Sequence, residues 1–138
     1  MTKVKIGVVD GYGGGIGSTI VKKLKEEFGG EIEIIALGTN AIATSEMMRA
    51  KANVGATGEN AFSIIAPQLD FIIGSISMLF PHSLMGEVTR KMAEAISLSN
   101  AVKLAIPLLK EKVEIVSIQP KPLPHMIDEL IEKLKGYI

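Results

Sequence analysis

The chain has 138 residues, of which 47% are hydrophobic, a formal net charge of zero, four phenylalanines, two tyrosines and no cysteine. This length suffices for a core of its own, and we expect residues 1–138 to form a single domain. The balanced charge and the few aromatic side chains argue against a nucleic-acid binder, and the missing cysteine excludes disulfides and zinc–thiolate sites.

Short apolar runs alternate with helical patterns along the chain, which predicts an α/β fold. Strands are expected at residues 3–10, 31–38, 69–75, 103–108 and 113–118. Between the first two strands, apolar residues recur at helical spacing at Ile16, Ile20, Val21, Leu24 and Phe28. Further helices are expected at about residues 40–52, 59–67, 84–98 and 122–135.

Only the segment "LLKEK" separates the last two expected strands. It is too short for the crossover helix that a parallel neighbour requires, so we expect the strand at 113–118 to run antiparallel at the sheet edge. Right-handed crossovers favour a strand order of 2-1-3-4-5, with 3-2-1-4-5 as the alternative. The predicted fold is a Rossmann-like three-layer sandwich with a mostly parallel five-stranded sheet.

A glycine-rich turn, "GYGGGIG" at residues 11–17, follows the first strand and opens the next helix. Glycine is needed where φ is positive or where a ligand approaches the backbone, and free amides at a helix start attract anions. The turn therefore predicts a phosphate site, and its expected residues are Gly11, Gly13, Gly14, Gly15, Ile16 and Gly17. The alternative is a tight turn that only lets the helix pack close to the sheet.

Asp10 stands directly before this turn, where a carboxylate would repel a bare phosphate. Three roles are open for Asp10: to hold Mg²⁺ against the phosphate, to accept a hydrogen bond from a ribose hydroxyl, or to accept hydrogen bonds from the amides of the glycine turn. The third role is favoured.

The second strand ends in Gly38, Thr39 and Asn40, where a dinucleotide site normally places an acidic residue. NAD binding of the usual kind is therefore disfavoured. Thr39 and Asn40 are candidate donors to a phosphate or a ribose, and Asn40 is also the expected N-cap of the following helix. Gly74 and Ser75, at the end of the third expected strand, are further candidates for ligand contact.

Two later segments have open interpretations. "GATGENAF" at 55–62 is either a second loop over the same sheet end or, as we favour, an ordinary helix start. The apolar residues Met78, Leu79, Phe80 and Met85 belong to a subunit interface, a lid or the core.

His82 and Glu87 are the one plausible acid/base pair in the sequence. A single histidine in a loop that follows a proline is more often structural or interfacial than catalytic. These two residues are therefore weak catalytic candidates, and no metal-ligand cluster is expected.

Together the segments "DGYGGGIG", "ALGTNAIAT", "GATGENA", "GEVTRKMAEAI" and "KPLP" resemble a family of short bacterial proteins catalogued only as a domain of unknown function. The resemblance covers nearly the whole chain and implies a Rossmann-like fold, without catalytic residues to carry over. A second resemblance, to short-chain dehydrogenases, is confined to residues 11–17. The Tyr-x-x-x-Lys of those enzymes is absent, because Tyr12 is followed four residues on by Ile16.

The leading functional hypothesis is a module that binds a nucleotide or phosphorylated small molecule without chemistry of its own. The alternatives are a small isomerase, lyase or hydrolase, a dehydrogenase-like NAD(P)-binding protein without the catalytic tyrosine, or an interaction protein with a purely architectural turn. A nucleotide, NAD(P) and Mg²⁺ are the open cofactors. We expect a homodimer, and a cytoplasmic location because no apolar run reaches the ~18 residues of a membrane span.

Overall fold

The computed structural model describes residues 2–109 and 112–138 of the chain. Its strands are β1 (Val4–Asp10), β2 (Ile32–Gly38), β3 (Val54–Thr57), β4 (Phe71–Ser75) and β5 (Val102–Ile106). Its α-helices are α1 (Gly15–Phe28), α2 (Ala41–Arg49), α3 (Glu59–Ile65), α4 (Arg90–Leu98) and α5 (Leu123–Lys135). Three short 3-10 helices lie at Gly29–Glu31, Ala66–Gln68 and Ile76–Leu79.

The five strands form one parallel sheet in the order β3-β2-β1-β4-β5. The favoured order 2-1-3-4-5, numbered by the expected strands, correctly places the strands at 31–38, 3–10, 69–75 and 103–108 side by side, but it lacks β3 and includes a strand at 113–118 that does not form. The alternative order is wrong, because it places the strand at 69–75 beside 31–38, whereas β4 pairs with β1. The expected antiparallel edge strand is also wrong, because β5 pairs in parallel with β4 and no strand of the described residues runs antiparallel. The α/β class and the count of five strands are confirmed.

The errors in the predicted sheet come from two segments, one that forms a strand without a strand-like sequence and one that has a strand-like sequence but forms no strand. Residues 54–57, "VGAT", form the edge strand β3 although they lack a long apolar run, and Val54 stays 48% exposed. Residues 113–118, "VEIVSI", form no strand and lie outside the sheet, with Val116 87% exposed. β-branched residues favour strands where a paired, half-buried surface is available, and this segment has none.

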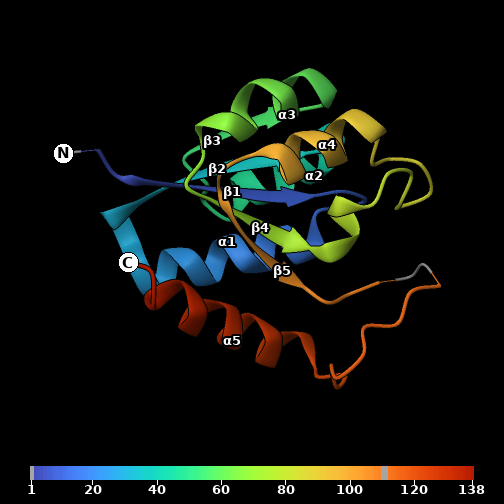
Figure 1. Cartoon of the computed structure of the whole chain (residues 1–138). Helices are drawn as coiled ribbons and strands as arrows, with labels where there is room; N and C mark the ends of the chain where they lie inside the picture. Colours follow the sequence, from blue (N-terminus) through green and yellow to red (C-terminus); the bar gives the residue numbers. More distant parts are fainter. Residues whose placement is uncertain (1, 110–111) are drawn as a thin grey trace.

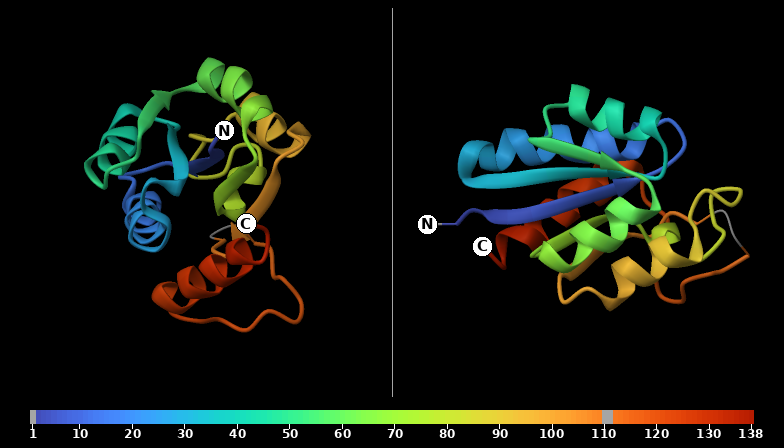
Figure 2. Two further views of the ribbon diagram at one scale, coloured as in Figure 1. Left: turned by 90° about the vertical axis from the view of Figure 1, so that its left-hand side faces the viewer. Right: turned by 90° about the horizontal axis from the view of Figure 1, so that it is seen from above.

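Helices cover both faces of the sheet (Figures 1 and 2). On one face, α1, α2 and α5 bury an apolar cluster that includes Leu24, Met47 and Ile131 against the strands. On the other face, α3 and α4 bury a second cluster that includes Phe62 and Ile96. The strands between these layers are almost continuously apolar, as parallel strands covered on both faces usually are.

The loops that follow β1 and β4 meet at one end of the sheet, to the right in Figure 1. Parallel strands present all their carboxyl ends at the same sheet edge, and the strand order changes side at β1, with β2 and β3 on one side and β4 and β5 on the other. In open α/β sheets this is the position of ligand crevices. No helix among the described residues is long and apolar enough to cross a membrane.

Candidate functional site

Asp10, the last residue of β1, is 8% exposed and lies beneath the glycine turn. One carboxylate oxygen accepts from the amide of Gly11 at 2.8 Å, and the other accepts from the amide of Gly17 at 2.6 Å. Of the three roles considered for Asp10, the structure shows the hydrogen bonds to the turn. The carboxylate fastens the start of α1 to the end of β1.

Three glycines of the turn are buried and are explained by packing or by backbone conformation: Gly11, Gly14 and Gly17. Gly14 has a φ of +74°, and a Cβ there would lie 2.8 Å from the carbonyl oxygen of Ala43. A Cβ on Gly17 would lie 2.7 Å from the sulfur of Met47. These positions let α1 approach α2 and the sheet closely, so the architectural interpretation holds for this part of the turn.

Gly13 and Gly15 are different, because both are exposed and neither is needed by the fold. Their φ angles are not in the left-handed region, and a Cβ on either would meet nothing within 4 Å. No described residue accepts a hydrogen bond from the amides of Gly13, Gly15 or Ile16. The N-cap residue Gly14 provides no side-chain cap and the first turn of α1 has no acidic residue. Asp10 accepts from the Gly17 amide, which leaves the amides of Gly15 and Ile16 available at the positive end of the helix dipole.

A second carboxylate reaches the turn from the loop between β4 and α4. Glu87 Oε1 accepts from the amide of Tyr12 at 2.9 Å, from the hydroxyl of Thr39 at 2.7 Å and from the side-chain amide of Asn40 at 2.9 Å. The carboxylate therefore joins the glycine turn to the residues that follow β2. This contact brings together parts of the chain that are 75 and 48 residues apart.

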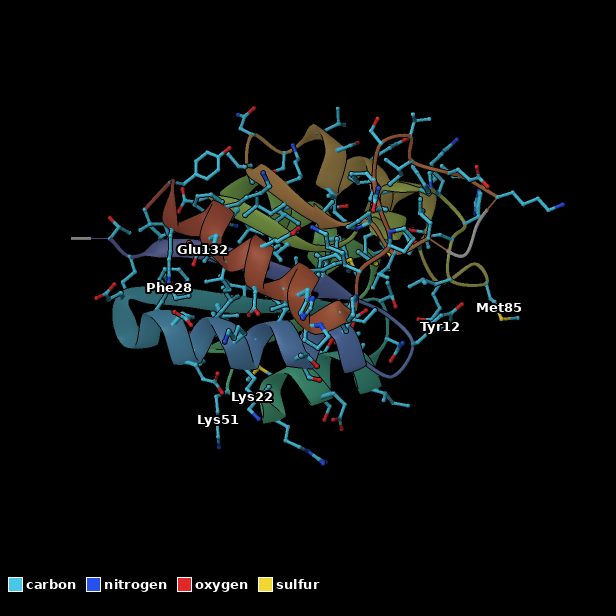
Figure 3. All side chains as sticks on the ribbon, turned by 90° about the horizontal axis from the view of Figure 1, so that it is seen from below. Tyr12, Lys22, Phe28, Lys51, Met85 and Glu132 are labelled. Carbon is cyan, nitrogen blue, oxygen red and sulfur yellow. The ribbon has the colours of Figure 1, made fainter. Side chains whose placement is uncertain are left out.

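The backbone that delivers Glu87 is unusual. Positive φ angles occur at His82 (71°), Leu84 (57°), Met85 (55°) and Gly86 (89°). Several internal hydrogen bonds stabilise this conformation, among them His82 N–H to the Val88 carbonyl at 2.6 Å. Strained backbone persists only where its surroundings over-determine it, and such residues gather at functional sites. Figure 3 shows Met85, from this loop, and Tyr12, from the glycine turn, at the same end of the molecule.

The two carboxylates have opposite electrostatic environments. Burial raises the pKa of Asp10; the amides of Gly17 and Gly11 act against that rise, and the charge of Glu87 adds to it. Burial also acts to raise the pKa of Glu87, but the hydrogen bonds from Thr39, Tyr12 and Asn40 together lower it below its ordinary value. Glu87 is thereby held as an ionised acceptor.

The proposed acid/base pair is not joined in the structure. The side chain of His82 is exposed, and the described residues include no hydrogen bond between it and Glu87. The expected helix at 84–98 begins only at Arg90, so both residues lie in the preceding loop. In the described part of the chain, three or more potential metal ligands do not gather anywhere.

The candidates after β4 lie beside a different loop. A Cβ on Gly74 would lie 2.6 Å from the carbonyl oxygen of Val9, so this glycine lets β4 approach β1. The hydroxyl of Ser75 donates to the carbonyl of Leu108 at 2.6 Å and so fastens the segment that follows β5. Gly74 and Ser75 are thus engaged in packing and loop anchoring.

The residues after β2 fulfil the expected local role. The Asn40 side chain accepts from the amide of Ala43 at 2.9 Å, which confirms Asn40 as the N-cap of α2. Its amide group also donates to the carbonyl of Tyr12 at 2.9 Å. What sequence reasoning missed is that Glu87 joins Thr39 and Asn40; no local pattern signals a contact across 48 residues.

The other two open segments have simple outcomes. Part of "GATGENAF" is the strand β3, after which Gly58, with a φ of 95°, leads into α3. Met78 is buried in the core, and Leu79 packs partly buried against it. Met85 is instead 95% exposed, so the core explains only part of this apolar segment.

Comparison with known proteins assigns the chain to a family. The family described as "Domain of unknown function (DUF3842)" matches residues 5–138. The chain belongs to this family. The DUF3842 match confirms the resemblance drawn from the sequence segments and includes every residue of the candidate site.

No curated protein matches the chain significantly in sequence. Among solved structures, the chain is similar to a "Crystal structure of universal stress protein in complex with cAMP", with a TM-score of 0.43 and 16% identity, over 76% of this chain and 98% of that chain.

Proposed function

We propose that the protein binds a nucleotide or another phosphorylated small molecule at the glycine turn, with no chemistry of its own. The observation that carries this proposal is the pair of open glycines. Gly13 and Gly15 face empty space and have ordinary φ angles, so neither packing nor conformation requires glycine there. A ligand that lies directly on the backbone does require it.

The chemistry of the open surface favours an anion. Gly13, Gly15 and Ile16 present amide donors at the start of α1, where the helix dipole adds partial positive charge. Phosphate oxygens suit such a group of neighbouring N–H donors. Asp10 does not project into this surface, since both of its oxygens are bonded to the turn from below.

The test is a thermal-shift and calorimetric screen of nucleotides, sugar phosphates and inorganic pyrophosphate, with and without Mg²⁺. A ligand present at 100 times its dissociation constant adds roughly 2.7 kcal/mol to the stability of the folded protein. We expect at least one phosphorylated compound to stabilise the wild type and to lose this effect in Gly15→Val, because the valine side chain would occupy the space above the amides.

Gly30→Val is the matched control. Gly30 also faces open space without a left-handed φ, but it lies in the short 3-10 helix at the far end of α1. We expect Gly30→Val to retain the ligand response of the wild type. A ligand response that survives Gly15→Val, or no response to any compound in the wild type, would contradict the proposal.

A further inference from the structure

Glu87 places a carboxylate near the end of β2, where the sequence itself has no acidic residue. In dinucleotide sites of doubly wound sheets, an acidic residue after the second strand accepts a hydrogen bond from the 2′-hydroxyl of a ribose. This chain has Gly38, Thr39 and Asn40 there. The structure brings a carboxylate to the same sheet end from another loop, because Glu87 Oε1 lies 2.7 Å from the Thr39 hydroxyl oxygen, directly beyond β2.

The carboxylate is fixed through one oxygen only. Oε1 receives three hydrogen bonds, from Tyr12, Thr39 and Asn40, and no described residue donates to Oε2. A carboxylate has about four acceptor positions, so Oε2 retains its full capacity. The side chain is also half-buried, which holds this acceptor in a defined orientation at the edge of the site.

The acceptor and the open amides belong to one surface. Glu87 bonds to the amide of Tyr12, the residue next to Gly13, so it stands at the edge of the turn that we propose for phosphate. The turn follows β1, and Thr39 follows the neighbouring strand β2. Along this edge of the sheet, the amides that would bind phosphate lie after β1 and the carboxylate that would accept from a sugar hydroxyl lies beside them, next to β2. A nucleoside phosphate, which carries its phosphate and its sugar hydroxyls side by side, fits this arrangement.

We propose that Glu87 accepts a hydrogen bond from the ribose 2′-hydroxyl of a ribonucleotide whose phosphates lie on the amides of Gly13, Gly15 and Ile16. This inference rests on the proposed function and narrows its ligand class to ribonucleotides. It assigns Glu87 a role in specificity, since the carboxylate discriminates ribose from deoxyribose. A sugar hydroxyl is a donor that an ionised carboxylate binds well, whereas a deoxyribose leaves Oε2 without its partner.

The experiment measures binding of ADP, GDP, UDP and CDP, each beside its 2′-deoxy counterpart, and of inorganic pyrophosphate by isothermal titration calorimetry. The proteins are the wild type, Glu87→Gln and Glu94→Gln. Glutamine at 87 retains one oxygen for the three donors and replaces the free oxygen with an amide. Glu94, on the exposed side of α4 beside Arg90, provides the control with the same loss of charge.

We expect the wild type to bind one ribonucleotide about tenfold or more tightly than its deoxy counterpart, since a hydrogen bond to a charged group contributes that much affinity. Glu87→Gln should weaken the ribonucleotide by a similar factor and leave the deoxynucleotide and pyrophosphate nearly unchanged. Glu94→Gln should behave as the wild type does.

Three outcomes would overturn the inference. Equal binding of ribonucleotides and deoxynucleotides by the wild type would do so without any variant and would leave the proposed phosphate site intact. Tighter binding of ribonucleotides and pyrophosphate to Glu87→Gln would show that Glu87 competes with the ligand anion. If the wild type binds no nucleotide, the inference fails, and the proposed function then depends on the response of Gly15→Val to pyrophosphate or sugar phosphates.

Discussion

Two sets of glycines share one turn and differ in what surrounds them. Gly11, Gly14 and Gly17 are buried against other parts of the protein, whereas Gly13 and Gly15 face open space. The first set is explained by the fold, because a side chain at any of these positions would collide with a neighbour. The second set is not. A glycine-rich motif can therefore contain both an architectural part and a part that only a ligand explains, and substitutions distinguish the two.

The largest effect is expected at the buried set, with Gly14→Val. The new Cβ would lie 2.8 Å from the carbonyl oxygen and 2.9 Å from the Cα of Ala43, both backbone atoms that cannot move aside, and the φ of +74° disfavours any L side chain. We expect a loss of about 2–4 kcal/mol in the free energy of unfolding, measured by urea denaturation. A stability equal to that of Gly13→Val, where the space is open, would remove the distinction between the two sets.

A smaller loss in the free energy of unfolding is expected from Asp10→Asn, which tests the hydrogen bonds from the glycine turn to the Asp10 carboxylate. Asparagine keeps one oxygen but points an N–H₂ group at the amide of Gly11 or Gly17, so one buried donor is left without an acceptor. The expected cost is about 1–3 kcal/mol in urea denaturation. Asp128→Asn is the control. Asp128 is exposed, and its ion pair with Lys23, at 3.8 Å, lies on the surface, where such pairs contribute little stability. Equal stabilities of the two variants would show that the Asp10 bonds do not hold the turn.

The open set should behave in the opposite way. Gly15→Ala places a methyl group in empty space at the first residue of α1 and reduces the freedom of the unfolded chain. We expect an increase of about 0.5–1 kcal/mol in the free energy of unfolding, together with weaker binding of any phosphorylated ligand found in the screen. A variant that is more stable and binds equally well would show that ligands do not use this amide.

The sequence predicted the strands and helices around the site well where they are long and apolar. β1, α1, β2 and α2 fall within a few residues of their expected bounds, and the cap at Asn40 is confirmed, because these features depend on local periodicity and turn chemistry. β3 escaped prediction because its four residues are mostly exposed and contain a glycine. The apolar run at 113–118 was wrongly predicted to be a strand, because its residues favour strands but find no neighbouring strand to pair with.

The candidate site divides in the same manner. Asp10 and the glycines are consecutive in the chain, so their proximity follows from a single turn. Glu87 was identified only as a weak catalytic candidate, and its contact with Thr39 depends on how a loop with several left-handed residues folds over β1. The sequence has no acidic residue directly after β2, and Asp10, the other candidate for a ribose acceptor, is bonded to the glycine turn in the structure. A contact across 48 residues requires the tertiary fold.

The smallest effect, on the pH dependence of stability, separates the two carboxylates by sign. Burial raises the pKa of Asp10 above its ordinary 3.8, so the folded state holds this proton more tightly and Asp10 contributes more stability as the pH falls. The hydrogen bonds from Thr39, Tyr12 and Asn40 overcome the effect of burial and hold the pKa of Glu87 below its ordinary 4.5. The contribution of Glu87 is therefore present above that value and is lost as the pH falls through its lower folded pKa.

Urea midpoints measured in steps from about pH 6 down to about pH 3, a range that spans the ordinary pKa values of both groups, should reveal these signs as differences from the wild type. On acidification, Glu87→Gln should lose less stability than the wild type, because it has no carboxylate to protonate at the Thr39 contact. Asp10→Asn should lose more, because it lacks the group whose protonation favours the folded state. Slopes that change in the same direction for both variants would mean that the two carboxylates occupy one electrostatic environment. The distinction between the buried carboxylate of Asp10 and the half-buried acceptor Glu87 would then be wrong.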